Sequence, residues 1–152
     1  MKMKTRKIIL TVIATFIVLV LPIAYFIKSN NNINDLSEIN TSIKTYKVRF
    51  ESDSGFGNDR FDIYSFSLKS QDNLKDFRQK NDELDQIFDN HFETMMVSEQ
   101  EKNNQIQELK ADIEKLKNSK HIIYKYIEKD GTKKLYLYDK NANKGYCMIL
   151  TI

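Results

Sequence analysis

The chain opens with a run of hydrophobic residues that carries no charge. The run extends from Ile8 to Ile27, and residues 1–7 before it hold four basic side chains. A helix rises about 1.5 Å per residue and the bilayer hydrocarbon is about 30 Å thick, so a run of roughly twenty residues is long enough to span it. We therefore expect a transmembrane signal-anchor helix at 8–27. Cleavage of the run as a secretory signal is the alternative.

The basic residues set the expected orientation of this anchor. Lys and Arg are retained on the cytoplasmic side of a membrane, so residues 1–7 should form a cytoplasmic tail and the rest should be extracytoplasmic. The wealth of Lys, Asn and Ile indicates a bacterial chain. Residues 28–42 are polar and rich in Asn, which predicts a linker without regular structure between the membrane and a domain.

Beyond the linker, hydrophobic and polar residues alternate in two runs. Lys44–Glu51 and Arg60–Leu68 show the period of two that is typical of half-buried strands, and the connection at 52–59 is rich in Gly, Ser and Asp. The two runs predict an antiparallel hairpin with a long connection. The acidic side chains of the connection lack the spacing of an EF-hand loop, so we interpret it as a polar turn.

From Asp72 the hydrophobic residues recur at spacings of three and four, which predicts a helix. Ser98–Glu101 fits the capping box S-x-x-E, which predicts that a second helix starts near Ser98, with one continuous helix over 72–118 as the alternative. A narrow seam at coiled-coil spacing follows: Ile106, Leu109, Ile113 and Leu116. We expect the seam to pack along the neighbouring helix. Homo-oligomer formation, or docking on another helical protein, is the alternative use.

The C-terminal part is again β. Asp130 and Gly131 separate two β-favouring runs, and this pair suits a type I′ turn because both positions need positive φ. A two-residue loop places Glu128 opposite Lys133, an attractive pair across the strands. A third strand is expected over Tyr146–Ile152.

This register sorts the hairpin residues into two faces. The first is apolar and is expected to face the core: Ile122, Tyr124, Tyr126, Leu135 and Leu137. The second mixes apolar, aromatic and basic side chains, and we favour its partial cover by one of the helices. If it is open, it is a candidate binding surface in which rings suit sugars or peptides and ammonium groups suit anionic polymers. Besides Ile123 and Ile127, this face carries the candidate binding residues Lys125, Lys134, Tyr136 and Tyr138.

Together these segments predict an extracytoplasmic α+β domain over residues 43–152. The element order is β-β-α-α-β-β-β, with an antiparallel sheet of up to five strands and the helical pair inserted between its two hairpins.

Net charge argues against nucleic acid as a partner. The formal charge of the chain is +3, but four of its 24 basic residues lie in the first seven, which leaves 20 basic against 21 acidic residues beyond them. No basic stripe remains to follow a phosphate backbone. Charge is nevertheless segregated, because residues 70–116 hold twelve acidic and six basic groups whereas residues 117–152 hold three and eight.

Few residues offer catalytic chemistry. His91 lies on the apolar stripe of the first helix and is expected in the core, while His121 is expected at the surface. The single cysteine, Cys147, lies in an apolar strand and is expected to be buried. No catalytic or metal-binding motif includes these residues, so no enzyme activity, cofactor or metal site is expected.

The functional expectation is therefore a single-pass cell-membrane protein whose extracytoplasmic domain binds another envelope protein, in assembly, immunity or regulation. The alternatives are a binding module for cell-wall polymer or a small anionic ligand, or a secreted effector or inhibitor if the N-terminal segment is cleaved.

Overall fold

The computed structural model describes residues 34–52, 59–98 and 103–151. Two compact units divide the chain, Met1–Asn40 and Thr41–Ile152.

In the described part of the first unit, residues 34–40 form consecutive turns. The amide of Ile39 donates to the carbonyl of Leu36 at 3.0 Å, and both side chains are buried. The sequence predicted no regular structure over 28–42, and the turns differ from that expectation because Leu36 and Ile39 supply apolar groups to bury. The predicted transmembrane helix at 8–27 lies outside the described residues. Within the described residues, no helix is long and apolar enough to cross a membrane.

The second unit is built on one six-stranded antiparallel sheet with the order β1-β2-β6-β5-β4-β3. The strands are β1 Ile43–Glu51, β2 Arg60–Leu68, β3 Arg78–Gln79, β4 Ile122–Lys129, β5 Thr132–Asp139 and β6 Lys144–Thr151. Two short 3-10 helices are η1 Asn40–Ser42 and η2 Asp72–Leu74. The α+β class is confirmed, and β3 is a sixth strand that the sequence did not predict.

The C-terminal hairpin has the predicted register. Glu128 pairs with Lys133 and Lys129 with Thr132 across the turn. Asp130 and Gly131 have φ values of 51° and 75°, as a type I′ turn requires. The predicted charge pair forms, with 3.8 Å between Lys133 Nζ and Glu128 Oε1.

The first hairpin is also confirmed, but its edge strand is irregular. β1 pairs only with β2, and the register shifts between Ile43 and Thr45 and again between Val48 and Phe50. Such bulges bend an edge strand and interrupt its backbone pattern. The β1–β2 connection at 53–58 lies outside the described residues.

Two helices follow, α2 Asp82–Ser98 and α3 Asn103–Lys117. The predicted separation into two helices is confirmed, but the second helix begins at Asn103 and Ser98 is the last residue of α2, so the predicted start near Ser98 is wrong. The predicted start at Asp72 is wrong, because η2 and β3 precede α2. The local spacing of Leu74 and Phe77 is compatible with a helix, but pairing of β3 with β4 holds this segment as 3-10 helix and strand.

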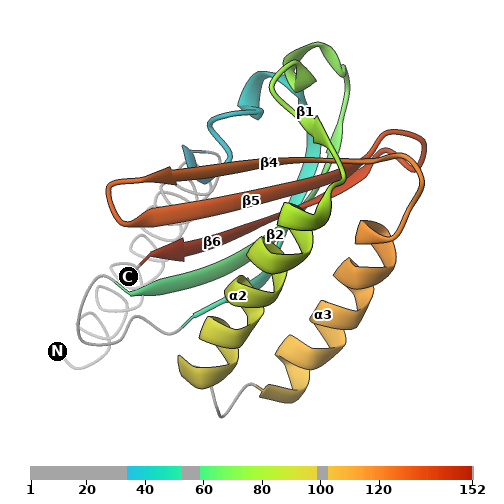
Figure 1. Ribbon diagram of the computed structural model, residues 1–152. Coiled ribbons are helices and arrows are strands. Elements are labelled where there is room, and N and C mark those ends of the chain that lie inside the picture. The colour runs from blue at the N-terminus through green and yellow to red at the C-terminus, as the bar shows by residue number, and fades with distance from the viewer. Residues whose placement is uncertain (1–33, 53–58, 99–102, 152) are drawn as a thin grey trace, which may run out of the picture. The chain divides into compact units, whose positions relative to one another are not determined.

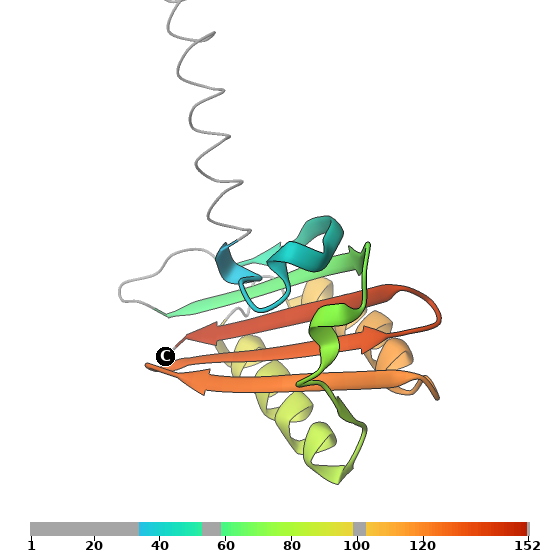
Figure 2. The ribbon, with the colours of Figure 1, turned by 90° about the horizontal axis from the view of Figure 1, so that it is seen from above.

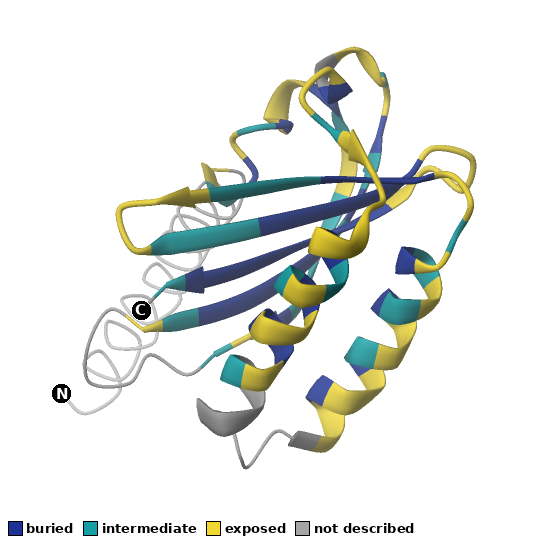
Figure 3. Ribbon diagram, in the orientation of Figure 1, coloured by how far each residue is buried: buried dark blue, intermediate teal, exposed yellow. Residues whose placement is uncertain are grey.

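Both helices lie on one face of the sheet, and the η2 segment crosses the opposite face (Figures 1 and 2). The helices turn their buried residues toward the sheet and expose their outer side (Figure 3). Apolar side chains from α2, α3 and the facing strands form one core: Phe50, Phe61, Ile63, Leu84, Phe88, Phe92, Ile106, Leu109, Ile113, Ile122, Tyr124, Leu135, Leu137, Tyr146, Met148 and Leu150. The predicted core face of the hairpin is thus confirmed, with Tyr126 partly buried against it.

Candidate functional site

The predicted aromatic surface does not present its rings to solvent. Tyr136 and Tyr138 are both 0% exposed. The Phe66 ring stacks on Tyr138 with 5.9 Å between centroids and meets Tyr136 edge-on at 6.4 Å, while Phe77 meets Tyr136 edge-on at 6.2 Å. Such pairs gain energy beyond the area they bury. In this arrangement the tyrosines pack inside the molecule and are not available to a sugar or peptide.

The two lysines of that predicted surface lie at intermediate exposure. Lys125 Nζ is 3.2 Å from a carboxylate oxygen of Asp76, in the segment between η2 and β3. This segment, and not a helix, provides the partial cover that we expected over this face (Figure 2). Lys125 is therefore already paired with a carboxylate within the domain. Lys134 lies opposite Ile127 on β4 and Ile149 on β6 in the sheet.

The predicted helix-docking seam is also used within the domain. Ile106 and Ile113 are fully buried, Leu109 is 5% exposed, and Leu116 packs partly buried against the core. The expectation that the seam packs inside its own domain is met. As folded, the seam has no free apolar face for a second helix.

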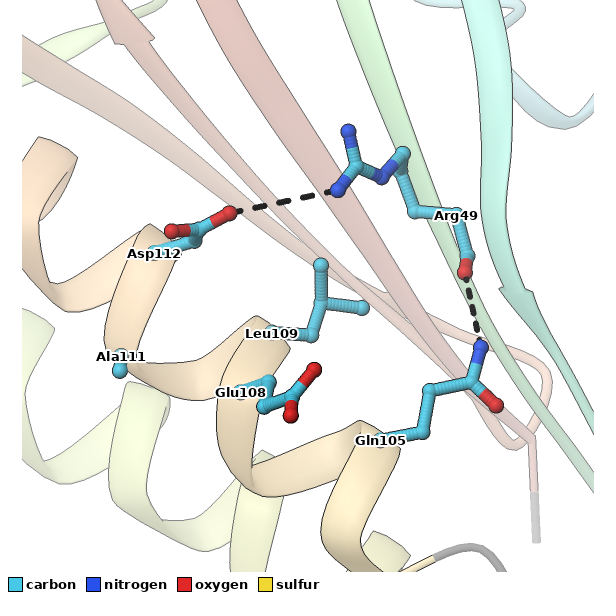
Figure 4. A pocket seen from close by; sticks show the side chains of 6 residues that line it. All are labelled: Arg49, Gln105, Glu108, Leu109, Ala111 and Asp112. Carbon is cyan, nitrogen blue, oxygen red and sulfur yellow. Dashed lines mark hydrogen bonds and ion pairs between the residues drawn. The ribbon is translucent and has the colours of Figure 1, made fainter.

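The structure instead shows a groove between α3 and the edge strand β1 that the sequence did not predict. Its volume is about 590 Å³. Six residues line it: Arg49, Gln105, Glu108, Leu109, Ala111 and Asp112. Figure 4 shows Leu109 at the centre, with Arg49 reaching from the strand toward Asp112 on the helix.

Charge is divided between the two walls of this groove. The Arg49 guanidinium lies 4.0 Å from the Asp112 carboxylate, a long ion pair with both groups accessible to water. The Gln105 amide donates to the carbonyl of Arg49 at 3.5 Å and bridges helix and strand (Figure 4). Among the residues that the structure describes, no cation pairs with Glu108. The groove therefore offers one apolar contact beside carboxylates that can accept a cation.

Tertiary structure rather than sequence pattern creates this groove. Arg49 looks like an ordinary polar residue of an alternating strand, and only the packing of α3 beside β1 brings it next to Gln105 and Asp112. The one sequence signal that points to an acidic groove is the segregation of charge along the chain, because α2 and α3 together carry eight acidic and three basic residues.

A buried acidic group lies on β2. Asp62 is 2% exposed and accepts from Arg60 Nε and, at 3.4 Å, from the amide of Ser52. Arg60 also donates to the Tyr64 hydroxyl at 3.0 Å. Burial raises the pKa of Asp62, and the Arg60 charge opposes that rise. Each group in this cluster is satisfied by another, so we interpret it as a structural network.

The remaining candidates for chemistry stand apart from one another. His91 and Cys147 are buried and His121 is exposed, as predicted. Within the described ranges, no cluster of three or more His, Cys, Asp or Glu side chains could hold a metal ion. Comparison with protein-family models, with curated proteins and with solved structures finds no match.

Proposed function

We propose that this chain is a membrane-anchored protein whose extracytoplasmic domain binds another protein through the groove between α3 and β1. The anchor is supported by the uncharged run at 8–27 behind four basic residues. The groove itself is the observation that carries the binding proposal.

The lining of the groove favours a protein over a small molecule. Small-molecule sites are mostly apolar and bury most of their ligand. Here four of the six lining side chains are charged or amide groups, and the apolar contact is small, because Ala111 is exposed but Leu109 is 5% exposed. A polar, solvent-accessible groove with a small apolar centre is closer to the surface that a protein partner covers.

The edge strand argues against pairing by strand addition. Lys44 and Lys47 lie on β1, and bulges interrupt its regular stretch on both sides of Thr45–Val48. Lysines and bulges are the devices that protect an edge strand from pairing with another chain. The partner should therefore contact side chains of α3 and Arg49, and bring a Lys or Arg toward Glu108.

Site-specific crosslinking in expressing cells tests the binding proposal. A photoreactive amino acid at Ala111 should yield a discrete adduct with one partner, whereas the same group at Gln86, an exposed position on α2, should not. Glu108→Lys should abolish the Ala111 adduct while the protein level stays unchanged, because it places a positive charge where the partner brings its own. Equal adducts at Ala111 and Gln86, or an adduct that Glu108→Lys leaves unaffected, would contradict binding at the groove.

Fractionation tests the anchor independently. Full-length chain, checked by mass determination, should remain in membranes after an alkaline wash. Recovery outside the cell of a form that begins near Asn30 would contradict the anchor and favour the secreted effector or inhibitor.

A further inference from the structure

A small cleft separates the second half of α2 from the sheet. Its volume is about 90 Å³, and residues of α2, β4, β5 and β6 line it: Ile87, Asn90, His91, Thr94, Tyr126, Lys133 and Leu150. No residue of α3 in the described part of the chain contributes to this lining. Space of this size accommodates no large ligand.

The imidazole of His91 has one bonded and one unbonded nitrogen in this cleft. Nδ1 lies 2.8 Å from the carbonyl of Ile87, and because a carbonyl only accepts, Nδ1 carries the proton. Nε2 then holds a lone pair, and among the described residues nothing donates to it. The residue is 2% exposed. Buried polar atoms without a partner are uncommon in folded proteins and call for an explanation.

The groups that face the ring decide what protonation of Nε2 would do. Lys133 on β5 brings a positive charge, and Glu128 on β4 brings a negative one that is shared with Lys133 and with the Tyr126 hydroxyl. The Tyr126 ring meets the imidazole edge-on at 6.0 Å, and Leu150 on β6 adds only apolar surface. Burial lowers the pKa of His91 and the Lys133 charge lowers it further, while the Ile87 carbonyl, the backbone of Lys133 and the Glu128 charge act in the opposite direction.

We propose that His91 makes the docking of α2 on the sheet sensitive to acid, so that protonation of Nε2 loosens α2. This regulation goes beyond the proposed binding function and does not depend on it. The imidazolium needs an acceptor for its second N–H, and among the described residues no acceptor lies within hydrogen-bond distance of Nε2. His91 lies between Phe88 and Phe92, which anchor α2 in the core. Moving His91 to solvent therefore requires this part of α2 to lift.

The sign of the effect follows from linkage. The folded-state pKa of His91 lies below the ordinary value of 6.5, so the loosened state binds a proton more readily than the docked state. Docking is unaffected above pH 6.5 and weakens as the pH falls below it. One proton taken up on opening corresponds to about a tenfold loss of hydrogen-exchange protection per pH unit, down to the folded-state pKa.

Hydrogen exchange of the full chain in mild detergent, corrected for intrinsic rates, tests this proposal. Between pH 7 and pH 5, peptides from α2 should lose protection more than peptides from β5. His121→Gln, at the other and exposed histidine, should leave this loss unchanged, whereas His91→Gln should remove it. Equal loss of protection in α2 and β5 would show global unfolding and overturn the proposal.

A titration of the wild-type protein covers the case in which His91→Gln does not fold. Side-chain nitrogen NMR should show an Nδ1–H tautomer for His91 and a pKa below 6.5. A pKa of 6.5 or higher, or a proton on Nε2 at pH 7, would overturn the proposal.

Discussion

Gly145 occupies a position on β6 where the fold leaves no room for a side chain. A Cβ added there would overlap the ring of Phe66, its partner on β2, with 2.6 Å to Cε2 of that ring. It would also lie 2.8 Å from the carbonyl oxygen of Leu137, its neighbour on β5. Real Cβ atoms essentially never approach other heavy atoms this closely, so Gly145→Ala must relieve both overlaps by displacing these neighbours.

Neither neighbour can move at low cost. Phe66 is 3% exposed and its ring is stacked on Tyr138 at an interplanar angle of 5°. The carbonyl of Leu137 belongs to the central β5–β6 pairing. Overpacking of this kind costs about 1–3 kcal/mol, and two simultaneous overlaps place Gly145→Ala near the upper end. Alanine recovers about 0.4–1 kcal/mol by restricting the unfolded chain, so the expected net loss is about 2 kcal/mol.

Urea unfolding of the full chain in detergent, followed by circular dichroism, measures this loss. With a slope of about 2 kcal/mol per molar urea, the midpoint should fall by about 1 M. Phe66→Leu provides the matched background, because leucine lacks the ring atoms that Cβ would meet. In the Phe66→Leu background, Gly145→Ala should lower the free energy of unfolding by only about 1 kcal/mol, because the overlap with the Leu137 carbonyl is the one that remains. An equal cost in both backgrounds, or a neutral Gly145→Ala, would refute the steric reasoning.

Three further predictions concern the β4–β5 hairpin. Gly131→Ala should lower the free energy of unfolding by about 1–2 kcal/mol in the same assay, because φ is 75° at this position and alanine is strained in the left-handed region. A loss of stability smaller than that of an alanine-to-glycine substitution at an exposed control position would contradict this reasoning. A double-mutant cycle on Glu128 and Lys133 should give a coupling of only about 0.2–0.5 kcal/mol that vanishes in high salt, since both groups are partly exposed. Burial, together with the hydrogen bond to Glu128, raises the pKa of Tyr126 to about 12, so its contribution to stability is complete below pH 10 and is lost as the pH rises from 10 to 12. Phenolate absorbance should show this late ionisation, and Tyr126→Phe should remove it; a pKa near 10 would count against the described packing.

Local sequence was enough to determine those features of the fold that depend on neighbours in the chain. Asp130 and Gly131 fix a two-residue turn, and a turn of fixed length fixes the register of both strands. That register places Leu135 and Leu137 on the core face. The spacing of Ile106 and Ile113 likewise determines which side of α3 is buried, because a helix repeats every 3.6 residues.

The tertiary structure alone decided what faces these elements. Most of the domain's sequence lies between β2 and β6, although the two strands are neighbours in the sheet. Only this strand order places Phe66 over Gly145 and against Tyr138. For this reason the tyrosines that looked like a binding surface in the sequence are core residues. Arg49 shows the converse: the packing of α3 beside β1, which the period of two does not reveal, makes an ordinary strand residue one wall of the groove. Periodicity tells which side of an element is apolar, but only long-range pairing determines what covers that side and where a groove is left open.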